Sequence, residues 1–256
     1  TLKKEYFDKK KGRSLIFAYL DNSIESLSLL INSLCSKHAV ALFSSALSIS
    51  LKNGLEQSYS PHYIFDLKRD EIPTYKCTSA RCFERIEPFE LEIDINIKLL
   101  LSTSGTTGSP KLVKLSEENI MSNAKSIGSY LPIKVSDVVP LNLPLNYSYG
   151  LSILTSNSLI GNTLVCGLPD ILSKEFWNLF SNLGFTTLAG VPFVYEMLDR
   201  IGFLKKEYSS LRYITQAGGR LRDSLILKVA SYAENCAIDF FVMYGQTEAT
   251  ARMSYM

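Results

Sequence analysis

The sequence has few of the residues that build disulfide or zinc frameworks. Its five cysteines form an odd set with no CxxC pair, and its two histidines, His38 and His62, do not accompany them. Disulfide scaffolds and zinc sites are therefore not expected, which favours a reducing, cytoplasmic environment. No apolar run reaches the roughly 18 residues that a membrane-spanning helix needs, so we expect no membrane span.

An excess of charge of either sign is also absent. The 27 lysines and arginines nearly balance the 25 aspartates and glutamates, leaving a net charge of +2. Nucleic-acid-binding proteins usually carry a strongly basic footprint, so we expect no nucleic-acid partner. The basic cluster within residues 3–13 is typical of a solvated chain end. A hydrophobic fraction of 46% with 20% charged residues indicates a globular protein.

Apolar runs alternate with amphipathic stretches in the first quarter of the chain. Strands are predicted at 14–20, 39–44 and 62–67. Residues 24–34 have helical spacing, with Asn22 and Ser23 as candidate caps, and the Asn53-Gly54 pair predicts the end of the next helix. This alternation predicts an α/β fold with mostly parallel sheets covered by helices.

Residues 68–97 interrupt that pattern. They are charged, contain Pro73 and Pro88, and alternate apolar with polar side chains, which predicts exposed strand or linker. We therefore place a possible seam between two α/β subdomains within 68–97. Further on, a helix is predicted at about 116–130 and strands near 138–143, 163–166, 186–189, 212–215 and 238–243.

A glycine-rich loop follows the apolar run at 98–101. It consists of Ser102, Thr103, Ser104, Gly105, Thr106, Thr107, Gly108 and Ser109, and Lys111 lies just beyond it. Glycines let backbone amides turn inward as an anion nest, hydroxyls add donors, and lysine adds a positive charge. The flanking strand and lysine favour phosphate binding over a flexible hairpin. The loop is not a Walker A motif, because Pro110 precedes Lys111 and Leu112 follows it.

Two segments near the end of the chain carry further candidate ligand groups. Gly218 and Gly219 follow a predicted strand, where absent side chains would let a flat base approach the backbone, although an ordinary turn has the same pattern. In YGQTE at 244–248, Tyr244 could stack on a base, Thr247 offers a hydroxyl, and Glu248 offers a hard oxygen ligand for Mg²⁺. Their position at a strand's carboxyl end favours ligand binding over core packing or a helix-dipole contact.

STSGTTGSPK is similar to the signature loop of the adenylate-forming superfamily, which includes acyl-CoA synthetases, peptide-synthetase adenylation domains and luciferases. Four more segments resemble that family's motifs in the same order. They are PLNYSYGL at 144–151, GVPFVYEML at 190–198, QAGGRL at 216–221 and YGQTE at 244–248. The resemblance implies the large domain of such an enzyme, with the small C-terminal domain absent from residues 1–256.

The resemblance also implies a role for each motif. The loop residues Thr103, Ser104, Gly105, Thr106, Thr107 and Gly108, with Lys111, would hold the β- and γ-phosphates of ATP. Gly218, Gly219, Tyr244 and Gly245 would contact the adenine side, Thr247 the α-phosphate, and Glu248 the Mg²⁺ ion. Lys111, Thr247 and Glu248 are the catalytic candidates. Tyr147 and Gly150 would line the acyl pocket, with Gly190, Tyr149, Leu151 and Tyr195 as neighbours.

Two residues depart from the family pattern. Tyr147 stands where the family often has histidine, and Arg220 stands where it often has a small residue. A tyrosine hydrogen-bonds differently from a histidine, so no particular carboxylic acid is transferred to this chain. Arg220 could meet an anionic substrate group, but a solvated arginine at a helix start is the simpler interpretation.

The implied reaction joins a carboxylate to the α-phosphorus of ATP, releases pyrophosphate, and passes the acyl group to CoA or to the phosphopantetheine of an acyl carrier protein. The family's ribose-binding aspartate, hinge arginine and catalytic lysine all follow the YGQTE motif. We therefore expect these 256 residues to bind nucleotide weakly and to turn over poorly by themselves. The alternatives are a nucleotide-binding or interaction module without turnover, and a general ATPase.

Overall fold

The computed structural model describes residues 12–79, 81–87, 91–102 and 111–256. The chain divides into two compact units, Thr1–Asn119 and Ile120–Met256. Residues 68–97, where the sequence suggested a seam, belong to the first unit. The predicted phosphate-binding residues Thr103, Ser104, Gly105, Thr106, Thr107 and Gly108 lie outside the described residues.

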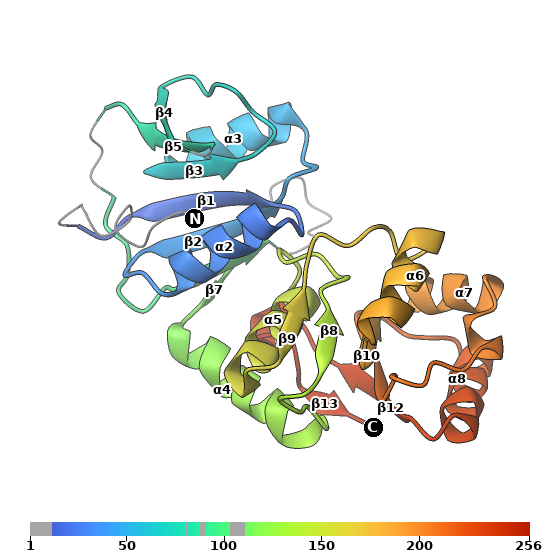
Figure 1. Cartoon of the computed structure of the whole chain (residues 1–256). Helices are drawn as coiled ribbons and strands as arrows, with labels where there is room; N and C mark the ends of the chain where they lie inside the picture. The colour runs from blue at the N-terminus through green and yellow to red at the C-terminus, as the bar shows by residue number, and fades with distance from the viewer. Residues whose placement is uncertain (1–11, 80, 88–90, 103–110) are drawn as a thin grey trace. The chain divides into compact units, whose positions relative to one another are not determined.

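The first unit is built on a seven-stranded sheet with the order β4-β5-β3-β1-β2-β6-β7 (Figure 1). Its four central strands are parallel, namely β1 (Leu15–Leu20), β2 (Ala39–Ser44), β3 (Tyr63–Asp66) and β6 (Leu99–Ser102). Antiparallel strands complete both edges, namely β4 (Tyr75–Ser79), β5 (Cys82–Arg85) and β7 (Leu112–Leu115). The three strands predicted before residue 68 are thus confirmed, whereas β7 was not predicted.

Helices α2 (Ile24–Leu34) and α3 (Ile49–Tyr59) connect the central strands. Because β2 and β3 pair with opposite sides of β1, right-handed connections place the two helices on opposite faces of the sheet. Ser23 caps α2 by accepting a hydrogen bond from the Ser26 amide at 3.2 Å. On the α3 face, Phe17 and Tyr19 of β1 pack in one core cluster with Leu55 of α3.

The prediction that a helix ends at Asn53-Gly54 is wrong, because α3 continues through both residues to Tyr59. The helix ends at Ser60, which adopts the left-handed conformation with φ of 45°. Burial of Leu55 in the core outweighs the poor helix propensity of glycine, which amounts to only about 1 kcal/mol. At this point tertiary packing overrides the local helix-ending signal of the Asn53-Gly54 pair.

Gly54→Ala is expected to raise the free energy of unfolding by about 0.5–1 kcal/mol, because alanine restricts the unfolded chain and favours the helix. Gly54 is exposed, and a Cβ built there has nothing within 4 Å. Urea denaturation followed by circular dichroism measures the change. Gly12→Ala, at an exposed position outside any helix, is the control and is expected to change stability less. A destabilised Gly54→Ala would contradict the assigned helix.

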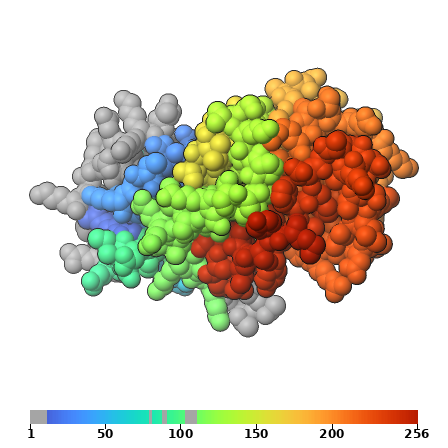
Figure 2. Space-filling view, turned by 90° about the horizontal axis from the view of Figure 1, so that it is seen from below, coloured from blue at the N-terminus to red at the C-terminus, as the bar shows by residue number. Residues whose placement is uncertain are grey.

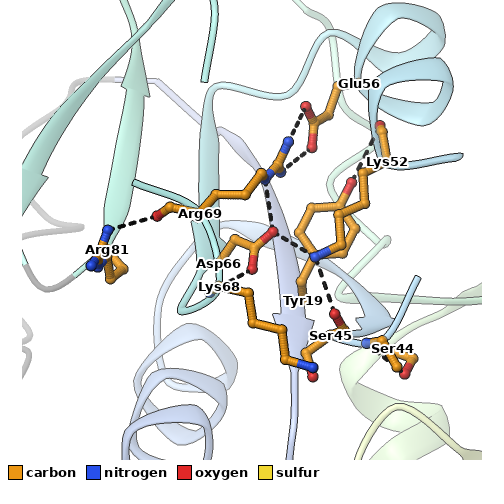
Figure 3. Close-up of polar contacts among 10 residues, drawn as sticks. Tyr19, Ser44, Ser45, Lys52, Glu56, Asp66, Lys68, Arg69 and Arg81 are labelled. Atoms are coloured by element: carbon orange, nitrogen blue, oxygen red, sulfur yellow. Dashed lines mark hydrogen bonds and ion pairs between the residues drawn. The ribbon is translucent and has the colours of Figure 1, made fainter. Parts of the chain in front are cut away.

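A buried charge cluster lies between α3 and the end of β3 (Figure 3). Lys52 donates to Asp66 at 2.7 Å, and Arg69 Nε donates to the same carboxylate at 2.8 Å. Arg69 also forms an ion pair with Glu56 through its terminal nitrogens. The ring of Tyr19 lies under both cations, 4.6 Å from Lys52 Nζ and 5.2 Å from the guanidinium carbon of Arg69. Two cations therefore neutralise two carboxylates inside the first unit.

The second unit contains a four-stranded sheet with the order β10-β11-β12-β13 and a separate parallel pair, β8 (Val138–Pro140) with β9 (Thr163–Val165). In the larger sheet, β10 (Thr187–Gly190), β11 (Tyr213–Gln216) and β12 (Asp239–Tyr244) are parallel, and β13 (Ser254–Tyr255) is antiparallel to β12. The longer helices are α4 (Glu117–Tyr130), α5 (Ser148–Ile160), α6 (Lys174–Leu183), α7 (Pro192–Arg200) and α8 (Asp223–Asn235). Short 3₁₀ turns occur at η1 (Phe203–Lys205) and η2 (Thr247–Ala249). The mixed α/β architecture and its mostly parallel central strands are those predicted.

An aromatic core holds the second unit together beneath its main sheet. Phe176 and Phe180 of α6 are fully buried and pack with Phe185, while Ile214 of β11 belongs to the same cluster. Full burial of a side chain of this size contributes about 1.5–3 kcal/mol per residue to stability. The core fixes β10, β11 and β12 side by side, so their carboxyl ends form one edge. In the part of the chain that is described, no helix has the length and apolar content required to cross a membrane.

Candidate functional site

The candidate site lies at the carboxyl edge of the main sheet in the second unit. The strands β10, β11 and β12 run in parallel and end at Gly190, Gln216 and Tyr244. The segments predicted from sequence to bind a ligand follow directly at this edge. Open α/β sheets bind ligands at the carboxyl ends of their strands, because loops and free backbone groups converge there.

A pocket at this edge contains all four residues predicted for the adenine side, which are Gly218, Gly219, Tyr244 and Gly245. The other walls include Gln216, Arg220, Asp223, Val242, Ser254 and Tyr255. The structure thus brings together two segments that are 26 residues apart in the sequence, by the numbers of Gly218 and Tyr244. β13 forms part of one wall, and its atoms are among those drawn in dark red in Figure 2.

Backbone geometry explains the first of the two glycines that follow β11. Gly218 has φ of +83°, and a Cβ at that position would lie 2.4 Å from the hydroxyl of Tyr147. Gly219 has φ of +158°, and its carbonyl accepts a 2.9 Å hydrogen bond from the side-chain amide of Gln216. The first position therefore requires glycine for conformation and space, and Gln216 holds the turn against the end of β11.

Gly245 is required by a closer contact. A Cβ there would lie 1.5 Å from the carbonyl oxygen of Ala251, which is far inside van der Waals contact. The chain therefore folds back on itself after β12, from η2 to β13. Tyr244, which precedes this glycine, has 63% of its surface exposed and is available to a flat ligand in the pocket.

Thr247 and Glu248 lie beyond the pocket, in η2. The Thr247 hydroxyl donates to the hydroxyl of Ser148 at 3.4 Å, which connects the YGQTE motif to the start of α5. Glu248 is exposed. Among the described residues, no group of three or more histidine, cysteine, aspartate or glutamate side chains is arranged to hold a metal. Mg²⁺ commonly takes one or two protein carboxylates with substrate phosphates, so a single exposed glutamate suits that mode of binding.

The PLNYSYGL motif contributes one side chain near the pocket and two buried ones. The hydroxyl of Tyr147 covers Gly218, as described above. Tyr149 is buried, and its hydroxyl lies 2.7 Å from that of Thr215. Burial raises the pKa of Tyr149 to about 12, so this phenol is neutral at physiological pH. Gly150 is buried in α5, where a Cβ would lie 2.2 Å from the carbonyl oxygen of Pro144, so its visible role is close backbone packing.

The neighbours proposed for the acyl pocket are also placed. Gly190 ends β10, and a Cβ there would lie 2.8 Å from the ring of Tyr195. Tyr195 is buried and donates from its hydroxyl to the Thr215 carbonyl oxygen at 2.9 Å. Leu151 is buried in α5. Both tyrosine hydroxyls thus contact Thr215 on β11. Tyr149 contacts the side chain of Thr215, and Tyr195 contacts its backbone carbonyl.

Lys111 is not brought together with these residues within one unit. It is exposed and lies immediately before β7, in the first unit. Its proposed contact with phosphate oxygens therefore stays a prediction, as do the roles of the loop residues 103–108.

Sequence reasoning missed three residues of the second unit. Gln216 anchors the glycine turn, Ser148 meets Thr247, and Arg252 stacks on Tyr149 with its guanidinium carbon 4.1 Å from the ring centre. Gln216 stands within a motif that the sequence singled out, so its position at a strand end could have suggested it. Arg252 had no such indication, because the inward direction of an arginine after a loop depends on tertiary packing.

A mostly parallel α/β sheet whose pocket is lined by two post-strand glycine turns defines a ligand-binding α/β protein of the open-sheet class. The profile of the family described as AMP-binding enzyme matches residues 39–256, which is more than half of the chain. The chain therefore belongs to the AMP-binding enzyme family, and the resemblance drawn from its motifs is confirmed.

Curated relatives of the chain are ligases. An oxalate–CoA ligase of Arabidopsis thaliana is 30% identical over 161 residues, which cover 61% of this chain and 30% of the relative. A medium-chain fatty-acid–CoA ligase of Escherichia coli is 30% identical over 154 residues, covering 59% of this chain and 26% of the relative. The matched segment thus spans less than a third of either relative's length.

Solved structures share the fold over nearly the whole chain. The N-terminal domain of FACL13 from Mycobacterium tuberculosis matches with a TM-score of 0.75 and 18% identity, over 95% of this chain and 65% of that one. Wild-type E. coli MenE matches with a TM-score of 0.74 and 17% identity, over 98% of this chain and 53% of that one. The chain has the fold of N-terminal domains of adenylate-forming enzymes, as predicted.

Proposed function

We propose that the protein activates a carboxylic acid with ATP, forming an acyl-adenylate and releasing pyrophosphate. The observation that carries the proposal is the pocket at the strand ends, where Gly218, Gly219, Tyr244 and Gly245 meet in a chain of the AMP-binding enzyme family. Membership of this family and the similarity to ligases support AMP-forming activation of an acid.

The proposed division of labour follows from the chemistry of the side chains. An adenine ring would lie against the glycine turn and Tyr244, which line the same pocket. Thr247 would donate to the α-phosphate from its place beside Ser148. Lys111 would neutralise the outer phosphates, assisted by hydroxyls and amides of the loop at 103–108.

Glu248 is the residue that would hold Mg²⁺, together with oxygens of the nucleotide, because both are hard ligands. When bound, the ion screens the negative charges that otherwise keep a carboxylate away from the α-phosphorus. The chain's own residues have the task of alignment and screening, since phosphoryl chemistry needs little covalent help.

The second step would pass the acyl group to a thiol. Relatives whose names state CoA as the acceptor favour CoA, and a fatty acid–[acyl-carrier-protein] ligase of Streptomyces coeruleorubidus leaves a carrier-protein phosphopantetheine as the alternative. The acids in the relatives' names differ, from oxalate to medium-chain fatty acids, so the names do not fix the acid. We propose a cytoplasmic location, in keeping with a soluble substrate and acceptor.

Carboxylate-dependent exchange of labelled pyrophosphate into ATP tests the proposal. The screen uses aryl, fatty, amino, hydroxy and dicarboxylic acids with Mg²⁺, and exchange is expected with one of these classes. Because the chain spans less than a third of its curated relatives, slow exchange is expected, and ATP binding is measured in parallel by titration calorimetry. ATP hydrolysis without any acid would overturn the ligase assignment in favour of an ATPase.

Glu248→Gln is expected to lower exchange by roughly tenfold or more, because the variant loses the anionic oxygen proposed for Mg²⁺. Glu234→Gln is the matched control, since Glu234 is an exposed glutamate at the end of α8, and no change is expected. Measuring exchange over a range of Mg²⁺ concentrations separates metal binding from misfolding, because the deficit should shrink as Mg²⁺ rises. Equal exchange by both variants would remove Glu248 from the mechanism. Binding of ATP without exchange by any acid would instead favour the nucleotide-binding module without turnover.

A further inference from the structure

Arg252 is a cation in an unusual environment. Its Nε atom is shielded from solvent and has no hydrogen-bond partner. One terminal nitrogen donates to the Ser152 hydroxyl at 3.1 Å, and the other to the neighbouring Ala251 carbonyl oxygen at 3.2 Å. Among the described residues, no aspartate or glutamate lies within ion-pair distance of Arg252.

Arg252 also lines a small, partly open cavity of about 20 Å³. Hydroxyl groups of Ser152, Ser156, Thr187 and Thr215 and the phenol of Tyr149 belong to residues on its walls. No described residue lining it is acidic. The walls are otherwise mostly apolar, so Arg252 is the one charged group among the described residues that line the cavity, and an anion is the partner that its charge favours.

The size of the cavity limits what can enter. A water molecule needs about 10–15 Å³ measured in the same way, so the cavity holds one or two groups of that size. A carboxylate has two such oxygens, and the planar guanidinium is the side chain that matches it with paired hydrogen bonds. An alkyl chain of several carbons would need a longer space and would leave Nε without a partner.

The cavity is also adjacent to the motif proposed for the reacting phosphate. Tyr149 on its wall follows Ser148, which accepts the hydrogen bond of Thr247, and Arg252 continues the same segment as Thr247. Burial lowers the pKa of Arg252, because the charged form is desolvated, so an anionic partner would recover stability for the cation. Stacking on Tyr149 alone would give a structural role but would leave Nε unsatisfied.

We infer that Arg252 binds a second, distal carboxylate of the acid that the protein activates, so that the substrate is a short dicarboxylic acid. This inference rests on the proposed function. Arg252 is the specificity-determining residue, and its Nε atom donates to the distal carboxylate.

Binding of succinate and butyrate, which have the same carbon skeleton and differ in one carboxylate, tests the inference by titration calorimetry in the presence of ATP and Mg²⁺. Succinate is expected to bind roughly tenfold or more tightly than butyrate. In Arg252→Met, which keeps an apolar contact with Tyr149, this preference should disappear. Arg252→Lys keeps the charge without the paired geometry and should retain a reduced preference. Arg222→Met removes an exposed arginine of the same unit and should leave the preference intact.

Thermal melting of each variant separates lost binding from lost folding. If Arg252→Met does not fold, Arg252→Lys is the deciding variant. An unchanged preference for succinate in Arg252→Lys would mean that a positive charge alone is sufficient and that the paired hydrogen bonds of the guanidinium are not used. Butyrate binding as tightly as succinate, or a preference that survives Arg252→Met, would overturn the inference. Pyrophosphate exchange is assayed separately with both acids. Exchange with butyrate only would contradict the dicarboxylate inference but support the proposed ligase activity. Succinate binding that depends on Arg252 but gives no exchange would support the anion site and contradict the proposed ligase activity.

Discussion

Replacing Lys52 by methionine is expected to lower the free energy of unfolding of the first unit by about 3–5 kcal/mol. Lys52 and Asp66 have only 1% and 0% of their side-chain surface exposed, and the charge cluster is neutral as long as both cations are present. Without Lys52, Arg69 is shared between Asp66 and Glu56, so one negative charge stays buried without compensation. Desolvation of that charge is the source of the large effect.

Urea denaturation followed by circular dichroism measures this change, with a fit that allows the two units to unfold separately. Lys228→Met is the matched control, because Lys228 pairs with Asp199 at the surface, where 52% and 30% of the two side chains are exposed. A loss of less than about 1 kcal/mol is expected there. Adding Asp66→Asn to Lys52→Met should recover part of the stability, since it removes the uncompensated charge. Equal losses for Lys52→Met and Lys228→Met would mean that the cluster is not buried.

Gly245→Ala is expected to weaken ATP binding by about 100-fold, because the added methyl group displaces the wall of the pocket by about 1 Å or more. The new Cβ would lie 1.5 Å from the Ala251 carbonyl oxygen and 3.0 Å from Cα of Arg252. Both neighbours are backbone atoms, so no side-chain rotation relieves the clash. Ala251 and Gly245 must separate, and Tyr244 moves with them.

Titration calorimetry with ATP and Mg²⁺ measures the effect of Gly245→Ala. Gly202→Ala is the control within the same unit, because Gly202 has φ of +79° but a Cβ there meets nothing within 4 Å. That variant should lose about 1 kcal/mol of stability from backbone strain and should bind ATP normally. Because Gly245→Ala also strains the fold, its melting temperature is measured first. ATP affinity within threefold of the original would show that the pocket does not depend on this close approach, or that ATP binds elsewhere.

The sequence predicted those parts of the fold in which local and global preferences agree. β1 and all of β2 except Ser44 are buried in the parallel part of the sheet, so both strands appear in the sequence as continuous apolar runs. Ser23 marks the start of α2 with its cap. α3 shows the opposite case, because the core contact of Leu55 carries the helix across Asn53 and Gly54. No local pattern contains that contact.

Residues 68–97 illustrate a second limit. They were expected to be exposed strand or linker, and they include the antiparallel pair β4–β5, in which Tyr75 and Phe83 are buried rather than exposed. Short strands at a sheet edge alternate apolar with polar residues in the same way as an exposed linker does. Only the pairing of β5 with β3 distinguishes the two, and pairing is a long-range property.

The candidate site was partly predictable from the positions of its residues at strand ends. Gly218, Gly219, Tyr244 and Gly245 follow strand ends, and parallel strands bring their ends together without further information. The contact of Gly245 with Ala251 depends on how the chain returns after η2, and the burial of Arg252 depends on α5 packing beside it. Neither could be derived from spacing. The loop at 103–108 and its relation to Lys111 stay predictions.

The walls of the pocket differ in how the chain makes them. The turn at Gly218 lies against Tyr147, a residue 71 positions away by their numbers, whereas β12 and β13 form a local hairpin within residues 239–256. Contacts close in sequence need little loop closure, so this hairpin can open and re-form without unfolding the rest of the sheet. The amides of Met253 and Met256 donate to the carbonyl oxygens of Tyr244 and Val242 across it. The rate of hydrogen exchange at these two amides therefore reports how often this wall of the pocket opens. A ligand that contacts Tyr255 would lower that exchange rate.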